Sequence, residues 1–597
     1  MMQNEIAVGY RLSPQQKRIW KLLEADPRAP YRSLVALSIE GMLNETRLTD
    51  ALREVVNRHE ILRTSYPVHH GLSLPLQTIS EAGLLYTEAD LSDLPEPHQQ
   101  SRLERLFEEE KRRPLDFKGG ENLRATLVRL SPTSNVLLIN VPAITSDGAG
   151  LDNLVGEVIS LYQDPQAGAS LQEPLQYADY SEWQNQLLEA EETRAGRDYW
   201  RRADFRNPAA LKLPFENRLA SESGFAPGVL SKTIEPETLD GIEALAARAE
   251  ASVASVLLAG WHALLWRTTD DDGIIVGACY EGRRFEGLGD AVGLFEKYLP
   301  IRCRLDDRQE FLDVVKSVEE SARAAELWQE SFAWEHLGDF QEAGDEKPFF
   351  PFLFDFREGR LERSSGELDF SIYRRYSCTD RSSIRLSCRR DQGKLTLDFH
   401  YDSALVRDES VRRLAGRFET LMQSAVSNPL SKVTRLNLLN LAEDREMAEW
   451  NRTERDYPRG ACAHELFEQQ ARQTPDAVAL EFAGETLTYR ELDERANRLA
   501  NHLVSLGVGP EVIVGVCLER SFDLIVALFG ILKAGGAYLP LDSAYPNQRL
   551  EYMAKDAGIR VLLTQSSLLD NFSHLVSHVV CLDSSRQQVD SLSPLRP

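Results

Sequence analysis

The sequence predicts an α/β protein in which helices pack on sheets, and three observations support this fold class. A short, mostly apolar run of strand length, Val136 to Val141, is followed by a turn and then by apolar residues at helical spacing. An alternating stretch at residues 395–401 precedes an amphipathic helical pattern at residues 411–425. Helix and strand patterns also alternate from residue 464 to residue 534, a rhythm typical of a parallel sheet.

Length and charge limit the classes of protein to consider. The 597 residues are 42% hydrophobic and 27% charged, which is ordinary globular composition. At about 150 residues per domain, this length suggests roughly four domains. The 68 Lys and Arg against 93 Asp and Glu leave a formal charge of -25, which repels phosphate backbones and anionic lipid surfaces. We therefore expect neither nucleic acid nor a membrane as a partner.

Cysteine usage and the N-terminal residues indicate the compartment. The seven cysteines are scattered, without the close spacing of a zinc knuckle or a redox pair. Residues 1–10 lack the profile of a signal peptide, and no apolar run approaches the roughly 20 residues of a membrane span. These features predict a cytoplasmic protein with reduced thiols and no metal site.

The first 180 residues alternate helical and extended patterns. A helix is predicted where Leu48, Leu52, Val55 and Val56 recur, ending near His59. After the strand at 136–141 comes a turn, Ser146-Asp147-Gly148. The apolar positions that follow lie on one face of a helix: Leu151, Leu154, Val155, Val158, Ile159 and Tyr162.

A segment rich in proline, glycine and polar residues at 207–228 indicates a connection to a second lobe. That lobe opens with a helix over 251–265 and a strand over 274–279. A polar, charged stretch then ends in Tyr457-Pro458-Arg459-Gly460 and is interpreted as a linker. The predicted division is therefore a first lobe at 10–205, a second lobe at 206–435, a linker at 436–460 and a third unit at 461–597.

Ordered motifs over the first two lobes carry a family resemblance. They are Ser13 to Trp20, Arg58 to Thr64, Tyr177 to Trp183, and Val292 to Arg302, the last with Glu296-Lys297-Tyr298 where the family has Val-Asn-Thr. In this order and at these separations they resemble the condensation domain of a nonribosomal peptide synthetase. The resemblance implies two chloramphenicol-acetyltransferase-like lobes that form a V around a tunnel.

Two further motifs resemble the beginning of an adenylation domain. Leu487 to Leu492 and Leu532 to Asp542 are similar to the first two core motifs of acyl-adenylate-forming enzymes, both of which are structural. The phosphate loop of that family, which would hold the nucleotide by backbone N–H groups, is expected only beyond Pro597. We therefore expect a truncated α/β adenylation fragment at 461–597 that is too short for activity.

The resemblance also implies a reaction centre. The family places His-His-x-x-x-Asp-Gly between a strand and the next helix, where the second His serves the attacking amine and the Asp pairs with an Arg of the second lobe. Here the motif position reads Pro142-Ala143-Ile144-Thr145-Ser146-Asp147-Gly148, so both histidines are absent. An alanine side chain has no donor or acceptor and cannot take a proton.

The retained Asp147 and Gly148 indicate that the turn is kept while the chemistry is lost. Arg283 stands where the family has its Gly-Arg before the crossing loop, so an Asp147–Arg283 salt bridge is predicted. The alternative is a helix-capping Asp147 without an arginine partner.

Other candidates for a base are weaker. His69-His70 is the only adjacent pair and is interpreted as a solvated turn, while His59 belongs to a structural motif. Thr145 and Ser146 lie on the right turn, but a free hydroxyl is a poor base without an activating neighbour. We therefore assign no catalytic residue.

Three functional hypotheses remain open. In the first, the condensation-like domain is non-catalytic and serves as a docking or interface platform for carrier proteins, a tailoring enzyme or the rest of an adenylation domain. In the second, it is a divergent condensation or starter acyltransfer domain that forms an amide by positioning alone. In the third, it is a structural relic that only stabilises the adenylation domain. The family resemblance implies phosphopantetheine arms of partner carrier proteins and no cofactor bound by this chain.

Overall fold

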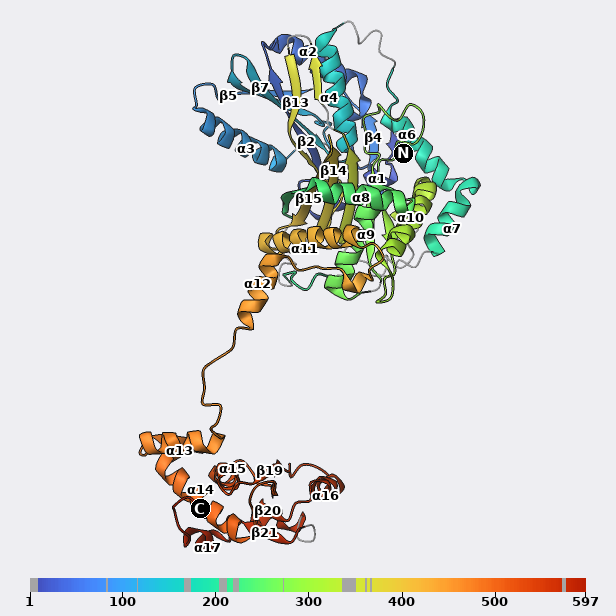
Figure 1. The fold of residues 1–597 in the computed structure, drawn as a ribbon. Helices are drawn as coiled ribbons and strands as arrows, with labels where there is room; N and C mark the ends of the chain where they lie inside the picture. Colours follow the sequence, from blue (N-terminus) through green and yellow to red (C-terminus); the bar gives the residue numbers. More distant parts are fainter. Residues whose placement is uncertain are drawn as a thin grey trace. The chain divides into compact units, whose positions relative to one another are not determined.

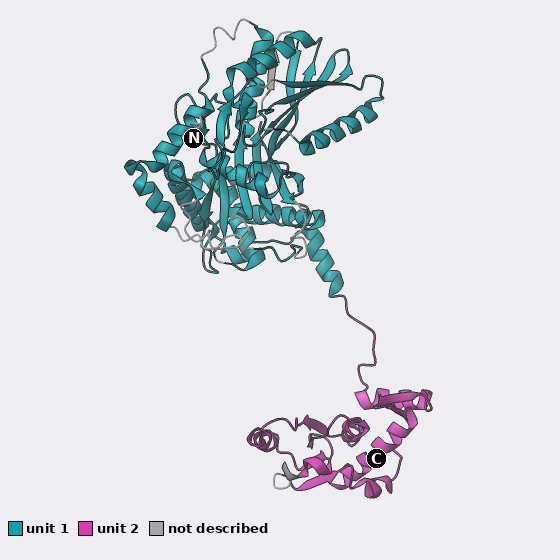
Figure 2. Cartoon of the chain, turned by 180° about the vertical axis from the view of Figure 1, so that it is seen from behind, with its two compact units in different colours: residues 1–451 teal, residues 452–597 magenta. Residues whose placement is uncertain are grey.

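The chain divides into two compact units, residues 1–451 and residues 452–597 (Figure 2). The computed structural model describes residues 9–81, 84–114, 116, 118–165, 173–202, 212–217, 225–271, 273–334, 350–359, 362–365, 368–571 and 576–597. Of the connection predicted at residues 207–228, residues 207–211 and 218–224 lie outside these ranges. Among the helices that are described, none is long and apolar enough to cross a membrane.

The first sheet of unit 1 has six strands in the order β12-β13-β2-β7-β6-β5, antiparallel except for the pair β5–β6 (Figure 1). Its strands are β12 (Glu362–Ser365), β13 (Leu368–Ser377), β2 (Arg32–Glu40), β7 (Ser134–Pro142), β6 (Arg124–Ser131) and β5 (Leu85–Asp90). The strand predicted at 136–141 is confirmed as the central strand β7. A small sheet of β1 (Tyr10–Arg11), β4 (Leu76–Ile79) and β3 (Thr64–Ser65) accompanies it.

Helices cover both faces of this first sheet. Neighbouring residues of β13, Arg374 and Arg375, pair with Glu108 of α3 (Glu96–Arg112) and Asp152 of α4 (Gly148–Gln163). Because successive side chains of a strand point to opposite faces, α3 and α4 lie on opposite sides of the sheet. Both helices predicted in this region are confirmed, α4 and its neighbour α2 (Glu45–Arg58). The other helices here are α1 (Pro14–Ala25), α6 (Tyr177–Glu189) and α7 (Arg194–Arg202).

The second sheet of unit 1 also has six strands, in the order β10-β9-β11-β14-β15-β8. The strands are β10 (Lys297–Arg302), β9 (Ile275–Tyr280), β11 (Phe352–Glu358), β14 (Ile384–Asp391), β15 (Lys394–Asp402) and β8 (Pro227–Ile234). The strands predicted at 274–279 and 395–401 are confirmed as β9 and β15. The helices of this half are α8 (Pro236–Ala249), α9 (Val253–Thr269), α10 (Phe311–Trp328) and α11 (Asp408–Ser427).

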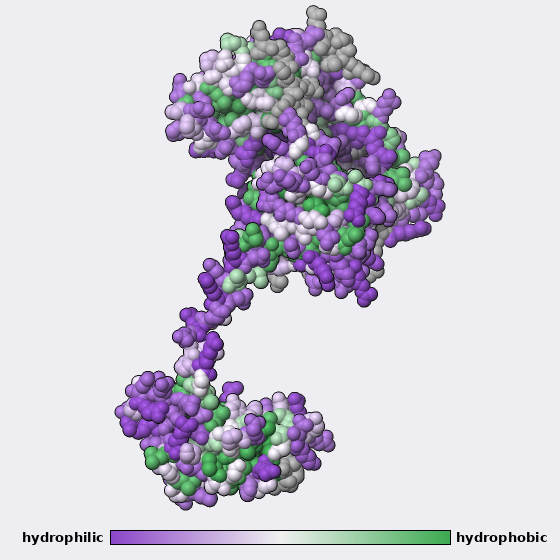
Figure 3. All heavy atoms as spheres, in the orientation of Figure 1, coloured by the Kyte–Doolittle hydropathy of each residue, from purple (hydrophilic) through white to green (hydrophobic). Residues whose placement is uncertain are grey.

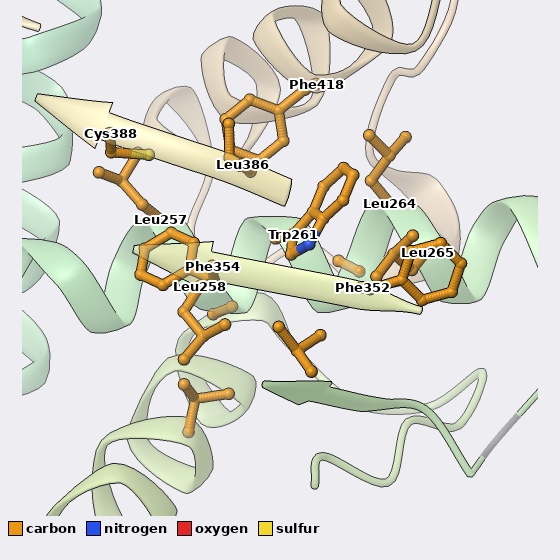
Figure 4. Close-up of a cluster of buried hydrophobic side chains, with 14 of the residues drawn as sticks. Leu257, Leu258, Trp261, Leu264, Leu265, Phe352, Phe354, Leu386, Cys388 and Phe418 are labelled. Carbon is orange, nitrogen blue, oxygen red and sulfur yellow. The ribbon is translucent and has the colours of Figure 1, made fainter. Parts of the chain in front are cut away.

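One face of the second sheet forms the core of its lobe. Figure 4 shows Trp261 of α9 between Phe352 and Leu386 of the strands and Phe418 of α11. These four side chains are fully buried. The helices predicted at 251–265 and 411–425 are confirmed as α9 and α11. Helix α11 turns an apolar side onto this core, whereas α9 is apolar on all sides and also packs against α8, α10 and α11.

Two segments of the second half of unit 1 pack with the first half. Strand β13 pairs with β2 in the first sheet, with Tyr376 opposite Leu34. Residues 288–295, which connect β9 to β10, place Val292 and Phe295 in the hydrophobic core of the first sheet. The two halves of unit 1 are thus joined by exchanged chain segments, and the predicted lobe boundary at 205/206 stays an interpretation.

The stretch predicted as a linker, 436–460, is not uniform. It contains the helix α12 (Leu441–Trp450), which begins with a capping box between Asn440 and Glu443. Glu443 also accepts a hydrogen bond from Arg417 of α11, so α12 belongs to unit 1. Residues 451–460 are exposed, and the segment is mostly hydrophilic in Figure 3.

Unit 2 contains a four-stranded parallel sheet in the order β19-β18-β20-β21. The parallel sheet predicted for this unit is confirmed for β18, but the prediction was wrong for the first strand, β16, which pairs antiparallel with β17 in a separate hairpin. The two-residue turn Ala483-Gly484, with positive φ at both residues, favours this hairpin over a crossover. The elements are α13 (Ala463–Gln473), β16 (Val478–Phe482), β17 (Glu485–Thr488), α14 (Tyr489–Ser505), β18 (Ile513–Val516), α15 (Phe522–Lys533), β19 (Ala537–Pro540), α16 (Asn547–Asp556), β20 (Val561–Thr564), β21 (His578–Cys581) and α17 (Arg586–Asp590).

Lys533 illustrates the structural character of the second adenylation-like motif. Its ammonium group is fully buried and donates to Glu468 of α13, and to Asp493 and Asn497 of α14, at 2.7–2.9 Å. This residue therefore ties three helices of unit 2 together.

Candidate functional site

The turn between β7 and α4 carries the residues singled out by the sequence. β7 ends at Pro142, and α4 begins at Gly148 after the cap residue Asp147. Within the turn, the Thr145 N–H donates to the Pro142 carbonyl, and the Ala143 N–H donates to the Tyr31 carbonyl. The predicted strand, turn and helix are therefore present, and local backbone hydrogen bonds hold the turn in place.

Asp147 is the most highly coordinated side chain of this turn. Its carboxylate accepts two hydrogen bonds from the Arg283 guanidinium, at 2.8 and 3.0 Å. It also accepts from the backbone N–H groups of Gly150, Phe295 and Glu296, at 2.7–2.9 Å. The structure thus brings Asp147 and Arg283 together, as predicted. Asp147 also caps α4, but the alternative of a cap without an arginine partner is wrong.

The charges of this pair follow from its surroundings. Burial by itself opposes ionisation of Asp147, but Arg283 and the backbone donors outweigh burial and hold the pKa of Asp147 below its usual value. Burial likewise disfavours the guanidinium, yet Asp147 raises the pKa of Arg283 above its usual value. We therefore describe the pair as a carboxylate and a guanidinium at neutral pH.

Two glycines allow the crossing segment to approach this turn. Gly282 has φ +68°, and a Cβ there would lie 2.2 Å from the Phe295 carbonyl oxygen. A Cβ on Gly293 would lie 2.0 Å from the Tyr177 ring. Neither position tolerates a side chain without movement of the backbone or of a buried ring.

The position of the second motif histidine is sealed. The five residues Ala143, Ile144, Thr145, Ser146 and Asp147 each have 0% exposed surface, so no solvent-filled space reaches them. Ala143 contributes a methyl group, and Pro142 supplies no backbone donor. The Ser146 hydroxyl donates to the Asp147 carbonyl at 3.1 Å. Residue 143 itself therefore offers no side-chain hydrogen-bond donor or acceptor.

A second set of charged residues lies beside Asp147, and the sequence reasoning did not assign it. Glu296, of which 5% is exposed, accepts a hydrogen bond from Thr379 and pairs with Arg357 of β11 at 3.1 Å. Lys297 pairs with Glu330 at 2.9 Å. Glu296 and Lys297 are two of the three residues that depart from the family pattern, and that departure was the available signal.

Burial governs the protonation of this second set. Burial raises the pKa of Glu296, and Arg357 counteracts only part of that effect. For Arg357, burial is outweighed by Glu296 and Asp355, and the pKa of the guanidinium lies above its usual value.

A small cavity borders these residues. Its volume is about 30 Å³, and Glu296, Lys297 and Tyr298 form one side of it. That volume has room for water but not for a substrate. Its lining includes the ion pair Arg18–Asp380 and does not include Ala143.

The candidate histidines have other surroundings. His59 is buried, with Nε2 2.5 Å from a Glu157 carboxylate oxygen, as expected for a structural residue. His70 is exposed in the loop before β4. Burial lowers the pKa of His262 to about 3, so this histidine is neutral in its core. His400, whose pKa is lowered by burial and then by Arg385, lines a separate small cavity with Tyr376.

Clusters of metal-ligating side chains are absent from the described part of the chain. Among its described residues, no group of three or more His, Cys, Asp or Glu side chains is arranged to hold a metal ion. The seven cysteines are free thiols.

Comparison with family models yields two matches. The model described as "Condensation domain" matches residues 7–448, which is more than half of the chain. The model described as "AMP-binding enzyme" matches residues 467–595.

Curated relatives are similar over almost the whole chain. Bacitracin synthase 1 of Bacillus licheniformis is 30% identical over 559 residues, which cover 93% of this chain and 10% of that protein. Phosphinothricin tripeptide synthetase PhsC of Streptomyces viridochromogenes is 32% identical over 588 residues, 96% of this chain and 53% of that protein. The chain therefore spans about a tenth to a half of the length of these two relatives.

Solved structures share the fold. A holo four-domain nonribosomal peptide synthetase bound to AMP and glycine matches 98% of this chain and 47% of its own, with a TM-score of 0.78 at 19% identity. A starter condensation domain of rhizomide synthetase, crystallised with C8-CoA, matches 72% of this chain and 98% of its own, with a TM-score of 0.62 at 17% identity.

Proposed function

The chain belongs to the condensation-domain family of nonribosomal peptide synthetases and continues into the start of an AMP-binding domain. From this premise, we propose that its condensation-like domain is non-catalytic. In this proposal the domain keeps the family's fold as a docking platform for carrier proteins. The phosphopantetheine arms belong to those carriers, and this chain binds no cofactor of its own.

A single observation carries the proposal. Position 143, where the family resemblance expects the catalytic histidine, holds a fully buried methyl group. A general base has to lie within hydrogen-bond reach of the amine and typically contributes about 10² to 10⁴ in rate. Without a basic side chain at residue 143, and without access of a substrate to this residue, the domain lacks this rate enhancement.

The charged residues beside Asp147 support the same proposal. Glu296 and Lys297 replace shorter, uncharged family residues, and both are engaged in ion pairs with Arg357 and Glu330. A substrate that entered beside Glu296 and Lys297 would have to separate these ion pairs, and breaking a buried ion pair is strongly unfavourable. The Asp147–Arg283 pair is retained in a purely structural role.

The fold of unit 1 can supply the scaffold of such a platform. It forms two six-stranded sheets, and exchanged segments join its two halves. Besides carrier domains, the remainder of an adenylation domain and a tailoring enzyme belong to the proposed partners, because the curated relatives extend well beyond this chain.

A transfer assay tests the loss of chemistry. One carrier loaded with an acyl thioester and one loaded with an aminoacyl thioester are incubated with the chain, and product is sought by intact mass. We expect no product above the level without the chain. Amide formation that depends on the folded domain would instead favour the divergent condensation or starter acyltransfer alternative.

A binding assay tests the docking role separately. Native mass spectrometry with holo carrier domains should detect a complex with residues 1–451 and with the full chain alike. If neither transfer nor carrier binding is observed, the platform proposal is wrong.

A further inference from the structure

An apolar patch lies on the surface of unit 1 where three elements meet. Its members are Trp183 of α6, Phe285 of the segment that connects β9 to β10, and Leu327 of α10, whose exposed fractions are 37%, 47% and 61%. The rings of Trp183 and Phe285 are in edge-to-face contact, with their centroids 5.1 Å apart. Large apolar side chains that are exposed singly are ordinary, whereas a group of them indicates an interaction site.

Two contacts bring the end of α10 to the other two elements. Arg284 donates a hydrogen bond to the carbonyl oxygen of Glu326 at 2.8 Å. These residues directly precede Phe285 and Leu327 in the chain. The short helix η5 (Gln329–Ser331), which follows α10, packs against α6. The three apolar side chains are therefore parts of one surface.

Aromatic packing supports the patch from below. Trp183 packs on Tyr180, with ring centroids 5.7 Å apart, and Tyr180 packs on the buried Phe295 at 4.6 Å. The Arg283 guanidinium lies over the Phe295 ring, 4.5 Å from its centroid. A surface that is ordered before binding loses less conformational entropy when a partner docks.

Carboxylates surround the patch. Asp179 lies one helical turn before Trp183 on α6, and Glu286 directly follows Phe285. The same three elements carry five exposed carboxylates in all, and no described basic side chain forms an ion pair with any of them: Asp179, Glu281, Glu286, Asp290 and Glu326.

Basic residues nearby do not cancel this charge. Arg284 is exposed and offsets one of the five carboxylates. Arg283 is neutralised by Asp147, and Arg11, which contacts α6, is neutralised by Glu182. The rim of the patch therefore keeps a net negative charge.

We propose that this patch docks a protein partner that presents an apolar side chain flanked by lysine or arginine. The apolar side chain covers Trp183 and Phe285, and the basic side chains face the carboxylates of the rim. An apolar, aromatic centre with a polar rim is the usual arrangement of a protein interface. Charge complementarity selects a basic partner, and the same charge repels nucleic acid and anionic lipid.

This inference goes beyond carrier docking and does not depend on the loss of catalysis. It needs no general base at residue 143 and no phosphopantetheine arm, because the partner is recognised by its own side chains. A failed test of the patch would leave the transfer and carrier-binding assays unaffected, and failure of those assays would leave the patch unaffected.

The test is fluorescence anisotropy with two labelled amphipathic peptides of equal length, one of leucine and lysine and one of leucine and glutamate. Each is titrated with the full chain at constant ionic strength. We expect saturable binding of the lysine peptide and none of the glutamate peptide. Trp183→Ala and Phe285→Ala should each weaken binding about tenfold or more, because aromatic anchors dominate the energetics of interfaces.

Helix α12 supplies matched controls for the anchor and for the charge. Trp450→Ala removes a tryptophan that is 67% exposed and should bind the lysine peptide normally. Glu286→Gln should weaken binding about two- to fivefold, as expected for the loss of an exposed ion pair. Glu449→Gln removes the same charge from an exposed position of α12 and should have no effect.

Several outcomes would overturn the docking surface. They are binding of neither peptide, equal binding of both, unchanged binding by Trp183→Ala and Phe285→Ala, and equal weakening by Trp450→Ala. Melting curves of each variant exclude misfolding as the cause of a loss. Hydroxyl-radical footprinting of the natural protein needs no variant: the lysine peptide should protect Trp183 and Phe285 from oxidation and leave Trp450 unchanged, and oxidation of Trp183 that the peptide does not reduce would contradict the proposal.

Discussion

At the scale of single residues, Asp147 combines two functions that are usually separate. It caps α4 through the Gly150 N–H and binds Arg283 of the crossing segment. A buried carboxylate with five hydrogen-bond donors is fully satisfied, and its loss leaves Arg283 buried without its partner.

The first prediction concerns this pair. Asp147→Ala should destabilise unit 1 by about 3 to 5 kcal/mol, because removal of one partner leaves a buried charge. Thermal unfolding followed by circular dichroism measures the loss. Asn44→Ala, which removes only the cap of α2, is the control and should cost about 1 kcal/mol. Equal losses in the two variants would show that Asp147 contributes no more than a cap.

The second prediction concerns pH. The pKa of Asp147 is lowered in the fold, so its contribution is complete above its unfolded pKa of about 3.9 and is lost as the pH falls through the lower folded pKa. The stability difference between the natural protein and Asp147→Asn should therefore shrink as the pH falls from about 5 through the unfolded pKa of about 3.9 and below. Melting temperatures across this range measure it.

Asp402 supplies the control for that pH series. Burial raises its pKa in the fold, so the linkage has the opposite sign. The natural protein should gain stability relative to Asp402→Asn as the pH falls. A parallel pH trend for the two substitutions would contradict the assignment of Asp147 as an ionised partner of Arg283.

Residue types alone could predict only part of this site. Asp147 and Arg283 were paired by family resemblance, and the structure places them in contact. The pairs Glu296–Arg357 and Lys297–Glu330 were not assigned, although residues 296 and 297 stood out as departures. Their partners lie 33 or more positions along the chain, and no local pattern links them.

At the scale of elements, the crossing segment between β9 and β10 is held by close backbone approach. An alanine in the left-handed conformation costs about 1 to 2 kcal/mol. Gly282→Ala should destabilise unit 1 by clearly more than this, because the added Cβ would also clash with the Phe295 carbonyl oxygen. Phe295 donates to Asp147, so the displacement would reach the site.

Gly287 in the same segment is the matched control for this third prediction. It has φ +85°, and a Cβ there would meet nothing within 4 Å. Gly287→Ala should therefore show only the conformational cost, as measured by the same melting experiment. Similar melting temperatures for the two variants would contradict the close approach at Gly282.

The elements themselves were largely predictable. The apolar run of β7, the alternation of β15 and the helical spacing of α4 and α11 all formed the expected elements. Pairing was less predictable. β16 was expected in the parallel sheet, and the exchange of β13 into the first sheet was not foreseen. Strand partners depend on contacts between distant residues, which periodicity does not encode.

At the scale of the whole molecule, the two units have separate hydrophobic cores. The fourth prediction is that trypsin cleaves at Arg452, Arg455 or Arg459, in the fully exposed segment 451–460, well before it cleaves at Arg445 in α12. Mass spectrometry of a time course identifies the cuts. Earlier cleavage at Arg445 would show that α12 is not part of unit 1.

Local pattern was sufficient for the α/β class, for most helices and strands and for the absence of an imidazole at position 143, because each of these is written in neighbouring residues. Folding in three dimensions decided that Ala143 is sealed, that Asp147 meets Arg283, and that Glu296 and Lys297 form ion pairs with Arg357 and Glu330. Burial and charge compensation depend on which distant segments pack together, and that is set by the exchanged segments 288–295 and 368–377 rather than by any local stretch.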